Sequence, residues 1–185
     1  MRGRLIAVVG PSGVGKDTVM TAVARAWPGL HLVRRVITRP SEAGGEDFEG
    51  VSPEAFRRRA VTGEFALHWQ AHGLCYGIPR GVSDVLAEGR PALVNLSRAV
   101  LAEAQARFPG MAVLSLTAPP EVLAARLSLR ARESAEEIGS RLARADRALP
   151  EDVTGVVTID NGGSLDDTVR AVLAALRPAR EEVMK

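Results

Sequence analysis

The chain has 185 residues, enough for one well-buried domain, and 46% of them are hydrophobic against 25% charged. A formal net charge of +2 is too small to indicate a general binder of nucleic acid or membrane surfaces. The single cysteine, Cys75, excludes an intramolecular disulfide and a cysteine-based metal cluster. No apolar run is as long as a membrane span. Both observations favour a cytoplasmic location.

The first expected element is a buried strand over residues 4–9 that leads into a phosphate-binding loop. The pattern GxxxxGK is matched by Gly10-Pro11-Ser12-Gly13-Val14-Gly15-Lys16. Backbone N–H groups of such a loop surround a phosphate, and the helix expected up to Trp27 points its positive end at the same anion. The sequence therefore predicts a site for the phosphates of ATP.

Lys16 is the expected catalytic residue of this loop. All but two of the 24 basic residues are arginine, and the other lysine is the C-terminal Lys185. A compact ammonium fits between phosphate oxygens where a planar guanidinium does not. Lys16 is therefore expected to bridge the β- and γ-phosphates. At the next position, where Ser or Thr usually binds Mg²⁺, the chain has Asp17 followed by Thr18, and either residue is a candidate ligand.

The middle of the chain interrupts the alternation of strands and helices. A strand is expected over 33–37 and an aperiodic loop over 39–51, and Ser52-Pro53 begins a short helix that Gly63 ends. Another short helix is expected between Pro79 and Gly89. The interruption predicts an inserted subdomain over residues 35–90, between core segments 1–34 and 91–185.

The second half returns to alternating strands and helices. Strands are expected over 92–96, 111–117 and 156–160, and helices after Ser97, from Pro119-Pro120 to about residue 130, from Ser134 to Leu149 and after Ser164. This alternation predicts the α/β class, a parallel sheet covered on both faces. Ligands of such folds bind at the carboxyl ends of the strands.

Short motifs along the chain resemble the guanylate kinase family in order and spacing. They are the phosphate loop, Ile37-Thr38-Arg39, Val51-Ser52-Pro53-Glu54-Ala55-Phe56, Gly63-Glu64-Phe65, Tyr76-Gly77, Arg130-x-Arg132, Ile138-x-x-Arg141-Leu142 and Ile159-Asp160-Asn161. The resemblance implies a three-layer α/β/α fold of the nucleoside-monophosphate-kinase type, an insertion that binds the acceptor, and a lid over about 128–145 that closes over ATP.

The departures from that family fall on the residues that would read guanine. Leu67 and Ile78 replace a Glu and a Ser, and Asn95 and Ser97 replace an acidic pair. Phe48 replaces a phosphate-contacting Tyr. Because a polar ligand edge left without partners binds poorly, GMP is not the expected acceptor.

A narrower resemblance accommodates both the matches and the departures. The segments Arg35-Val36-Ile37-Thr38-Arg39-Pro40, Gly44-Gly45-Glu46-Asp47, Phe65 to Leu74 and Tyr76-Gly77-Ile78-Pro79 resemble the ribose 1,5-bisphosphate phosphokinases of phosphonate metabolism. The resemblance implies that ATP and ribose 1,5-bisphosphate give 5-phosphoribosyl 1-diphosphate (PRPP) and ADP. The nucleophile is then an ionised phosphate oxygen, so positioning and charge compensation suffice without a general base.

The candidate site residues follow from this reaction. Arg35 and Arg39 are expected on the acceptor's phosphates, although a solvated basic loop is the alternative. Further acceptor contacts are expected from Glu46 and Tyr76, and from His68 and His72, which could contact ribose hydroxyls. His68 and His72 could also pair on a helix as metal ligands, or be structural. From the lid, Arg130, Arg132, Arg141 and Arg144 could clamp the transferred group, although Arg141 and Arg144 could instead line an exposed helix face. Asn161 is expected near adenine by resemblance.

Three other functions remain open at this stage. They are a guanylate kinase with an altered pocket, a catalytically silent scaffold, and a kinase of a small alcohol with Glu46 or Asp47 as base. The intact loop around Lys16 counts against the scaffold. The expected partners are ATP and a phosphorylated ribose, and the oligomeric state is open.

Overall fold

The computed structural model describes residues 3–40, 46–128 and 148–177. Within them lies a five-stranded sheet in the order β2-β7-β1-β8-β9. Each neighbouring pair of its strands is parallel. The strands are β1 (Leu5–Val9), β2 (His31–Leu32), β7 (Ala92–Asn95), β8 (Ala112–Thr117) and β9 (Val156–Asp160). The predicted α/β class with a parallel sheet is confirmed.

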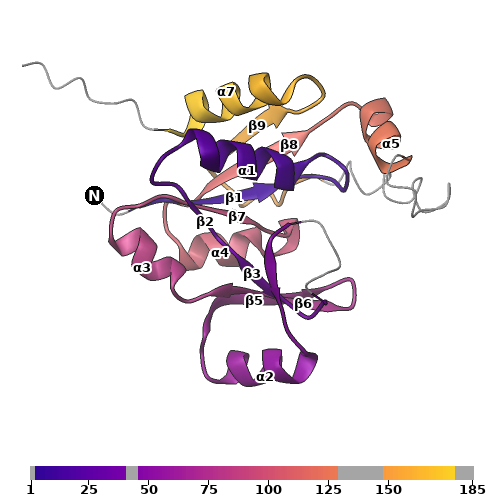
Figure 1. Ribbon diagram of the computed structural model, residues 1–185. Coiled ribbons are helices and arrows are strands. Elements are labelled where there is room, and N and C mark those ends of the chain that lie inside the picture. The colour runs from indigo at the N-terminus through magenta and orange to yellow at the C-terminus, as the bar shows by residue number, and fades with distance from the viewer. Residues whose placement is uncertain (1–2, 41–45, 129–147, 178–185) are drawn as a thin grey trace, which may run out of the picture.

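Helices cover both faces of this sheet. The helices α1 (Lys16–Ala26) and α7 (Leu165–Leu176) lie on one face, and α3 (Val82–Ala87) and α4 (Leu101–Arg107) lie on the other (Figure 1). Side chains of a strand alternate between faces, so Ile6 and Val8 of β1 pack in the cluster that includes α1. Leu5 and Ala7 pack in the cluster that includes α3. Burial on both faces explains why the central strand is apolar throughout.

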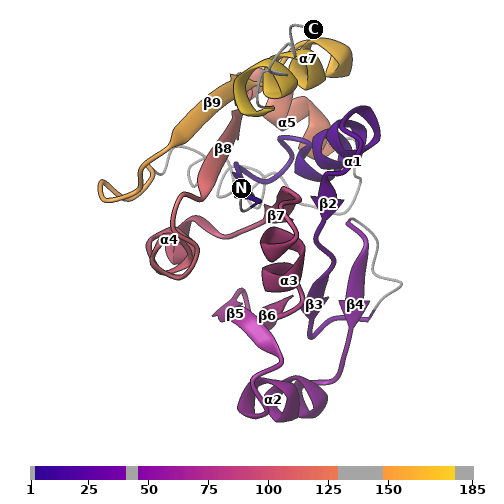
Figure 2. The same ribbon diagram turned by 90° about the vertical axis from the view of Figure 1, so that its left-hand side faces the viewer.

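A second sheet forms from the predicted insertion, in the order β4-β3-β6-β5. Its strands are β3 (Arg35–Ile37), β4 (Phe48–Gly50), β5 (Phe65–Ala71) and β6 (Leu74–Pro79). Helix α2 (Pro53–Val61) packs on its outer side, where the rings of Phe56 and Phe65 stack with centroids 4.6 Å apart. Figure 2 shows this sheet and α2 at the opposite end of the molecule from α7.

The inner side of the second sheet belongs to the same core as the main sheet. Leu67 and Ile78 are 3% and 1% exposed and pack in the cluster that contains Leu5 and Val94. Val82 of α3 joins that cluster too. The two positions that would read guanine therefore hold core side chains.

The hairpin of β5 and β6 differs most from the expectations. Its turn consists of His72 and Gly73, with φ of 52° and 74°, the left-handed values that two-residue hairpin turns require. The helical spacing considered for His68 and His72 is therefore wrong, since His68 lies in a strand. The strand expected over 33–37 is found as β3, which begins two residues later at Arg35, whereas the preceding strand β2, which belongs to the main sheet, was not predicted. The expected loop over 39–51 contains β4.

The predicted helix starts after Ser97 and Ser164 are confirmed. Ser97 Oγ accepts a hydrogen bond from the Ala99 amide at the start of a 3₁₀ turn, η2 (Arg98–Val100), that precedes α4. Ser164 Oγ accepts from the Asp167 amide at 3.2 Å. Helix α5 (Pro120–Ser128) begins at the predicted prolines. The helix expected over 134–149 and the lid lie almost wholly outside the described residues. Among those described, no helix has the length and apolar character needed to cross a membrane.

Candidate active site

The phosphate loop connects the end of β1 to the start of α1. Two of its glycines are required by their surroundings. A Cβ at Gly10 would lie 2.6 Å from the Leu116 carbonyl oxygen. Gly15 has φ of 92° at the N-cap of α1, and a Cβ there would lie 2.9 Å from the Asn161 side chain. Close packing against β8 and the end of β9 therefore fixes the loop's path.

A buried hydrogen-bond network supports the loop from below. The Val14 carbonyl accepts from Asn161 Nδ2 at 2.7 Å and from Arg126 Nη1 at 3.3 Å. Asn161 Oδ1 accepts from the Thr168 hydroxyl at 2.7 Å. The structure thus places Asn161, expected near adenine, beneath the loop with 5% exposure. The role of Arg126 in this network was not anticipated from the sequence.

Lys16 lies over the loop that precedes it. Its Nζ donates to the carbonyl oxygens of Gly10 at 2.9 Å and Pro11 at 3.1 Å. The pKa of Lys16 is lowered from 10.5 to about 8, mainly because the ammonium is buried. The charges of Arg35 and Arg98 contribute to this lowering, and those of Asp17 and Glu46 oppose it. The ammonium therefore occupies a site whose charge balance favours an added anion.

A pocket of about 630 Å³ opens between the loop and the second sheet. The main sheet and its loops contribute Gly10, Pro11, Ser12, Lys16, Asn95, Leu96, Ser97 and Arg98, and the second sheet and its turns contribute Arg35, Arg39, Trp69, Ala71, His72 and Tyr76. The pocket thus lies at the carboxyl ends of β1 and β7, where ligands of open parallel sheets bind. Four basic side chains line its described part.

Arg35 contacts several of the side chains at the second-sheet side of the pocket. It is 7% exposed and forms a two-pronged ion pair with Glu46. Its guanidinium lies 5.1 Å from the Tyr76 ring centroid and 5.8 Å from that of Trp69, and the two rings stack at 5.3 Å. Asn95 Nδ2 also approaches Glu46 at 3.5 Å. The guanidinium fork of Arg35 is therefore directed at Glu46 in this structure.

Two other arginines enter the pocket from opposite walls. Arg39 lies over the Phe48 ring of β4, 4.4 Å from its centroid. Arg98 follows the end of β7 on the main sheet, and burial lowers the pKa of its guanidinium. Sequence reasoning missed Arg98. The available signal was its place directly after the strand that neighbours β1.

The pocket gathers some predicted residues and leaves others outside. Lys16, Arg35, Arg39, His72 and Tyr76 line it, and Glu46 reaches it through Arg35. His68 is exposed on the opposite face of β5, with its ring 6.2 Å from that of Phe65. Strand alternation explains this, because Trp69 and Ala71 then face the pocket. Trp69 packs against the core and lines the pocket as well.

The predicted metal ligands and lid residues do not line the described part of the pocket. Asp17 and Thr18 lie in the first turn of α1, next to Lys16 but outside the pocket lining, and Thr18 is exposed. No group of three or more His, Cys, Asp or Glu side chains suited to a metal occurs in the described part of the chain. Magnesium commonly takes one or two protein oxygens together with substrate phosphates, so the carboxylate of Asp17 and the hydroxyl of Ser12 suit it chemically. Arg130, Arg132, Arg141 and Arg144 lie outside the described residues.

The fold and this pocket define a class, the P-loop phosphotransferases of nucleoside-monophosphate-kinase architecture. Two solved structures share the fold. The guanylate kinase from Anaplasma phagocytophilum is 20% identical with a TM-score of 0.67, covering 95% of this chain and 85% of that one. A gluconokinase from Sinorhizobium meliloti 1021 is 22% identical with a TM-score of 0.56, covering 94% and 91%.

Sequence relatives are far more similar. The ribose 1,5-bisphosphate phosphokinase PhnN of Ruegeria sp. (strain TM1040) is 51% identical over 179 residues, 97% of this chain and 94% of the relative. The PhnN protein of Azotobacter vinelandii is 49% identical over 96% and 97% of the two chains. No family model matches the chain. Identity at this level over nearly the whole length shows that the chain belongs to the ribose 1,5-bisphosphate phosphokinase family.

Proposed function

We propose that this protein transfers the γ-phosphoryl group of ATP to ribose 1,5-bisphosphate and releases PRPP and ADP. The observation that carries the proposal is the burial of Leu67 and Ile78 in the hydrophobic core. A guanylate kinase pocket needs polar groups at these two positions, whereas here the pocket is lined by cations and an aromatic pair. Such a lining suits a phosphorylated sugar better than a purine base.

The donor site consists of the phosphate loop and Lys16. Backbone N–H groups of the loop bind the β- and γ-phosphates of ATP, and the Lys16 ammonium exchanges its carbonyl contacts for phosphate oxygens. Asp17 and Ser12 are the oxygen donors available to a magnesium ion, which when bound compensates charge on the donor phosphates. The Asn161 and Arg126 network keeps the loop in its open curve.

The acceptor site lies against the second sheet. Arg39 binds a phosphate of the sugar, and the Trp69 and Tyr76 rings form an apolar wall for the ribose carbons. Arg35 holds Glu46 beside the pocket, where the carboxylate accepts hydrogen bonds from ribose hydroxyls. From the lid, Arg130, Arg132 and Arg141 are proposed to close over the transferred group.

The reaction needs no proton removed by the protein. An oxygen of the sugar's 1-phosphate bonds to the γ-phosphorus, and the bond from that phosphorus to the bridging oxygen of ADP breaks. ADP leaves with the electron pair. Because the attacking oxygen is already ionised, the site's cations contribute by alignment and by compensating negative charge.

The test offers the purified protein ATP and magnesium with either ribose 1,5-bisphosphate or GMP, and follows ADP and product by chromatography. We expect PRPP from the first acceptor and no product from the second. Phosphorylation of GMP alone would refute the proposal. Lys16→Ala serves as the inactive control for contaminating kinases.

A further inference from the structure

Arg98 occupies a position between the donor loop and the acceptor pocket. Strands β1 and β7 are neighbours, with Val8 opposite Asn95, and the Leu96 amide donates to the Val8 carbonyl at 3.0 Å. The residues that follow β7 therefore lie beside the start of the phosphate loop. Both Arg98 and Lys16 line the pocket formed there.

The charges of these two residues are close and partly removed from water. The charge of Arg98 contributes to lowering the pKa of Lys16, and burial lowers the pKa of the Arg98 guanidinium itself. Two cations held together in this way are stabilised when anionic groups bind beside them. Lys16 can bind such a group from the loop, and Arg98 can bind a neighbouring one from the end of β7.

The other arginines of the pocket leave this position to Arg98. The fork of Arg35 is directed at Glu46. Arg39 lies over Phe48 on the second sheet, and so enters from the opposite wall. A sugar with a phosphate at each end can therefore reach one arginine on each wall.

We propose that Arg98 binds the 1-phosphate of ribose 1,5-bisphosphate, the group that attacks ATP, while Arg39 binds the 5-phosphate. This inference rests on the proposed function. Arg98 holds the attacking oxygen beside the γ-phosphoryl group on Lys16, and its fixed fork can contact two oxygens of one phosphate. The bond changes are those of the transfer itself, with no additional reactant.

The test compares two ligands that differ only in the 1-phosphate. Calorimetry without nucleotide measures the binding of ribose 1,5-bisphosphate and of ribose 5-phosphate to wild type, Arg98→Gln and Arg39→Gln. Loss of a charge-assisted contact lowers affinity by about tenfold to a hundredfold. We expect Arg98→Gln to show this loss for the bisphosphate and at most about a twofold change for ribose 5-phosphate. Arg39→Gln should weaken both ligands.

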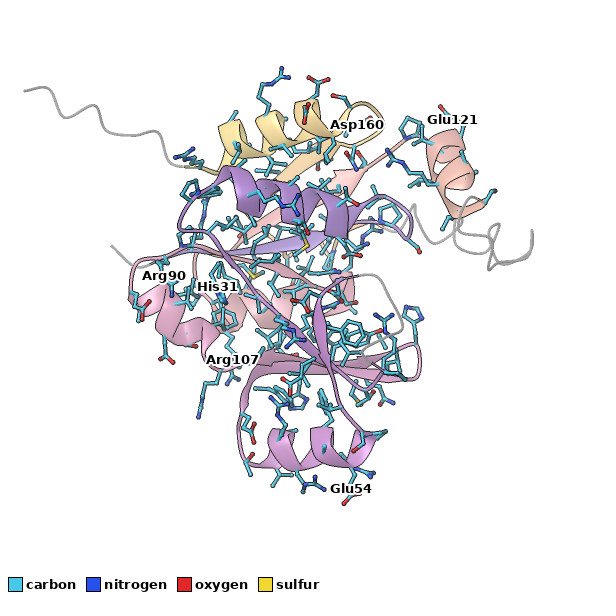
Figure 3. The ribbon with its side chains drawn as sticks, viewed as in Figure 1. His31, Glu54, Arg90, Arg107, Glu121 and Asp160 are labelled. Carbon is cyan, nitrogen blue, oxygen red and sulfur yellow. The ribbon has the colours of Figure 1, made fainter. Side chains whose placement is uncertain are left out.

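Controls separate this effect from general damage. Arg107→Gln removes an exposed arginine of α4 that does not line the pocket, and should leave both affinities unchanged; Arg107 is labelled in Figure 3. Arg98→Lys keeps the charge without the planar fork, so it should also weaken the bisphosphate more than ribose 5-phosphate, but by a smaller factor than Arg98→Gln. This variant replaces Arg98→Gln if that variant unfolds. Binding of a non-hydrolysable ATP analogue should change little in either variant.

Several results would overturn the assignment. Equal weakening of both sugars in Arg98→Gln would place Arg98 on the 5-phosphate or the ribose. Unchanged affinity for both would remove it from the acceptor site, and weakening of the ATP analogue alone would place it on the donor. If wild type itself neither binds nor phosphorylates ribose 1,5-bisphosphate, the proposed function fails and this inference with it. A failure confined to the Arg98 comparison leaves the function standing.

Discussion

The donor and acceptor halves of the pocket are built in different ways. The donor half is one continuous loop between β1 and α1, held by backbone packing and by Asn161 beneath it. The acceptor half is assembled from side chains of β3, β5, β6 and the residues after β7, far apart along the chain. A continuous loop leaves a sequence pattern that can be found by inspection. An assembled wall can change its ligand through single substitutions, because no backbone path has to be altered.

The sharpest test of the donor half is removal of its ammonium. Lys16→Ala should lower kcat by about a thousandfold or more, because the charge developing on the transferred group loses its closest compensation. Steady-state ADP release measures this, and circular dichroism checks the fold. Thr21→Ala, an exposed substitution on the same helix, is the matched control. Near-normal turnover in Lys16→Ala would remove the loop from the chemistry.

The acceptor half should resist conversion into a guanine site. Leu67→Glu restores the residue type that reads guanine but places a carboxylate in the core, where Leu67 is 3% exposed. We expect a loss of unfolding free energy of roughly 3 kcal/mol or more and no activity with GMP. Urea denaturation measures the loss. Gln70→Glu, on the exposed face of the same strand, should cost less than about 0.5 kcal/mol. A stable Leu67→Glu protein that phosphorylates GMP would contradict the core assignment.

The support beneath the loop should contribute a smaller amount. Asn161→Ala removes the bond to the Val14 carbonyl and the 2.7 Å bond from the Thr168 hydroxyl, which keeps only its longer contacts with backbone carbonyls. We expect a loss of about 1–3 kcal/mol in stability and a higher KM for ATP, with little change in acceptor affinity. Thermal denaturation and kinetics with each substrate varied separately measure these effects, with Thr158→Ala on β9 as the exposed control. A change in the KM of the acceptor alone would show that Asn161 supports the acceptor half of the pocket and not the donor loop.

The smallest expected effect is a proton taken up on nucleotide binding. The pKa of Lys16 is lowered to about 8 in the free protein, so at that pH about half of the molecules carry a neutral amine. Phosphates favour the ammonium, so binding raises this pKa and consumes a proton, and affinity for ATP should fall as pH rises above about 8. Calorimetry at pH 8 in two buffers of different ionisation enthalpy measures the uptake. Lys16→Met should abolish it, whereas persistent uptake in that variant would assign the proton to another group.

The lowered pKa of Lys16 also makes the stability of the folded protein depend on pH. The folded value lies below the unfolded one, so the folded state binds the proton less tightly than the unfolded chain. The contribution of this group to stability is complete above the unfolded pKa of about 10.5 and is lost as pH falls through about 8. At neutral pH the buried ammonium therefore destabilises the ligand-free protein.

Much of the fold could be predicted from the sequence, because its signals are local. The GxxxxGK pattern and the serine caps at 97 and 164 depend on residues within one turn of each other. The hairpin of β5 and β6 was not predicted, since its turn contains His72 rather than the Asn or Asp usual there. That β2 and β3 are separate strands of different sheets depends on their pairing with β7 and β6, and local periodicity carries no information about that pairing.

The site was predicted unevenly for the same reason. Lys16 follows from its loop, and Arg35 and Arg39 from a resemblance carried by short motifs. Arg98 and the support from Arg126 depend on which strand ends lie side by side, and that is a property of the whole sheet. His68 was expected in the pocket as a polar group for ribose hydroxyls, but it lies in β5 next to Trp69, and neighbours in a strand face opposite ways.

The gathering of cations in one pocket also affects how the protein behaves when it is idle. The charges of Arg35 and Arg98 act against the buried ammonium of Lys16, which is a cost to the folded state, and any polyanion that enters relieves it. Thermal midpoint and resistance to proteases should therefore follow the concentration of nucleotide, or of sulfate in a purification buffer. In a cell, the lifetime of this protein would then depend on the supply of the phosphorylated metabolites that it consumes.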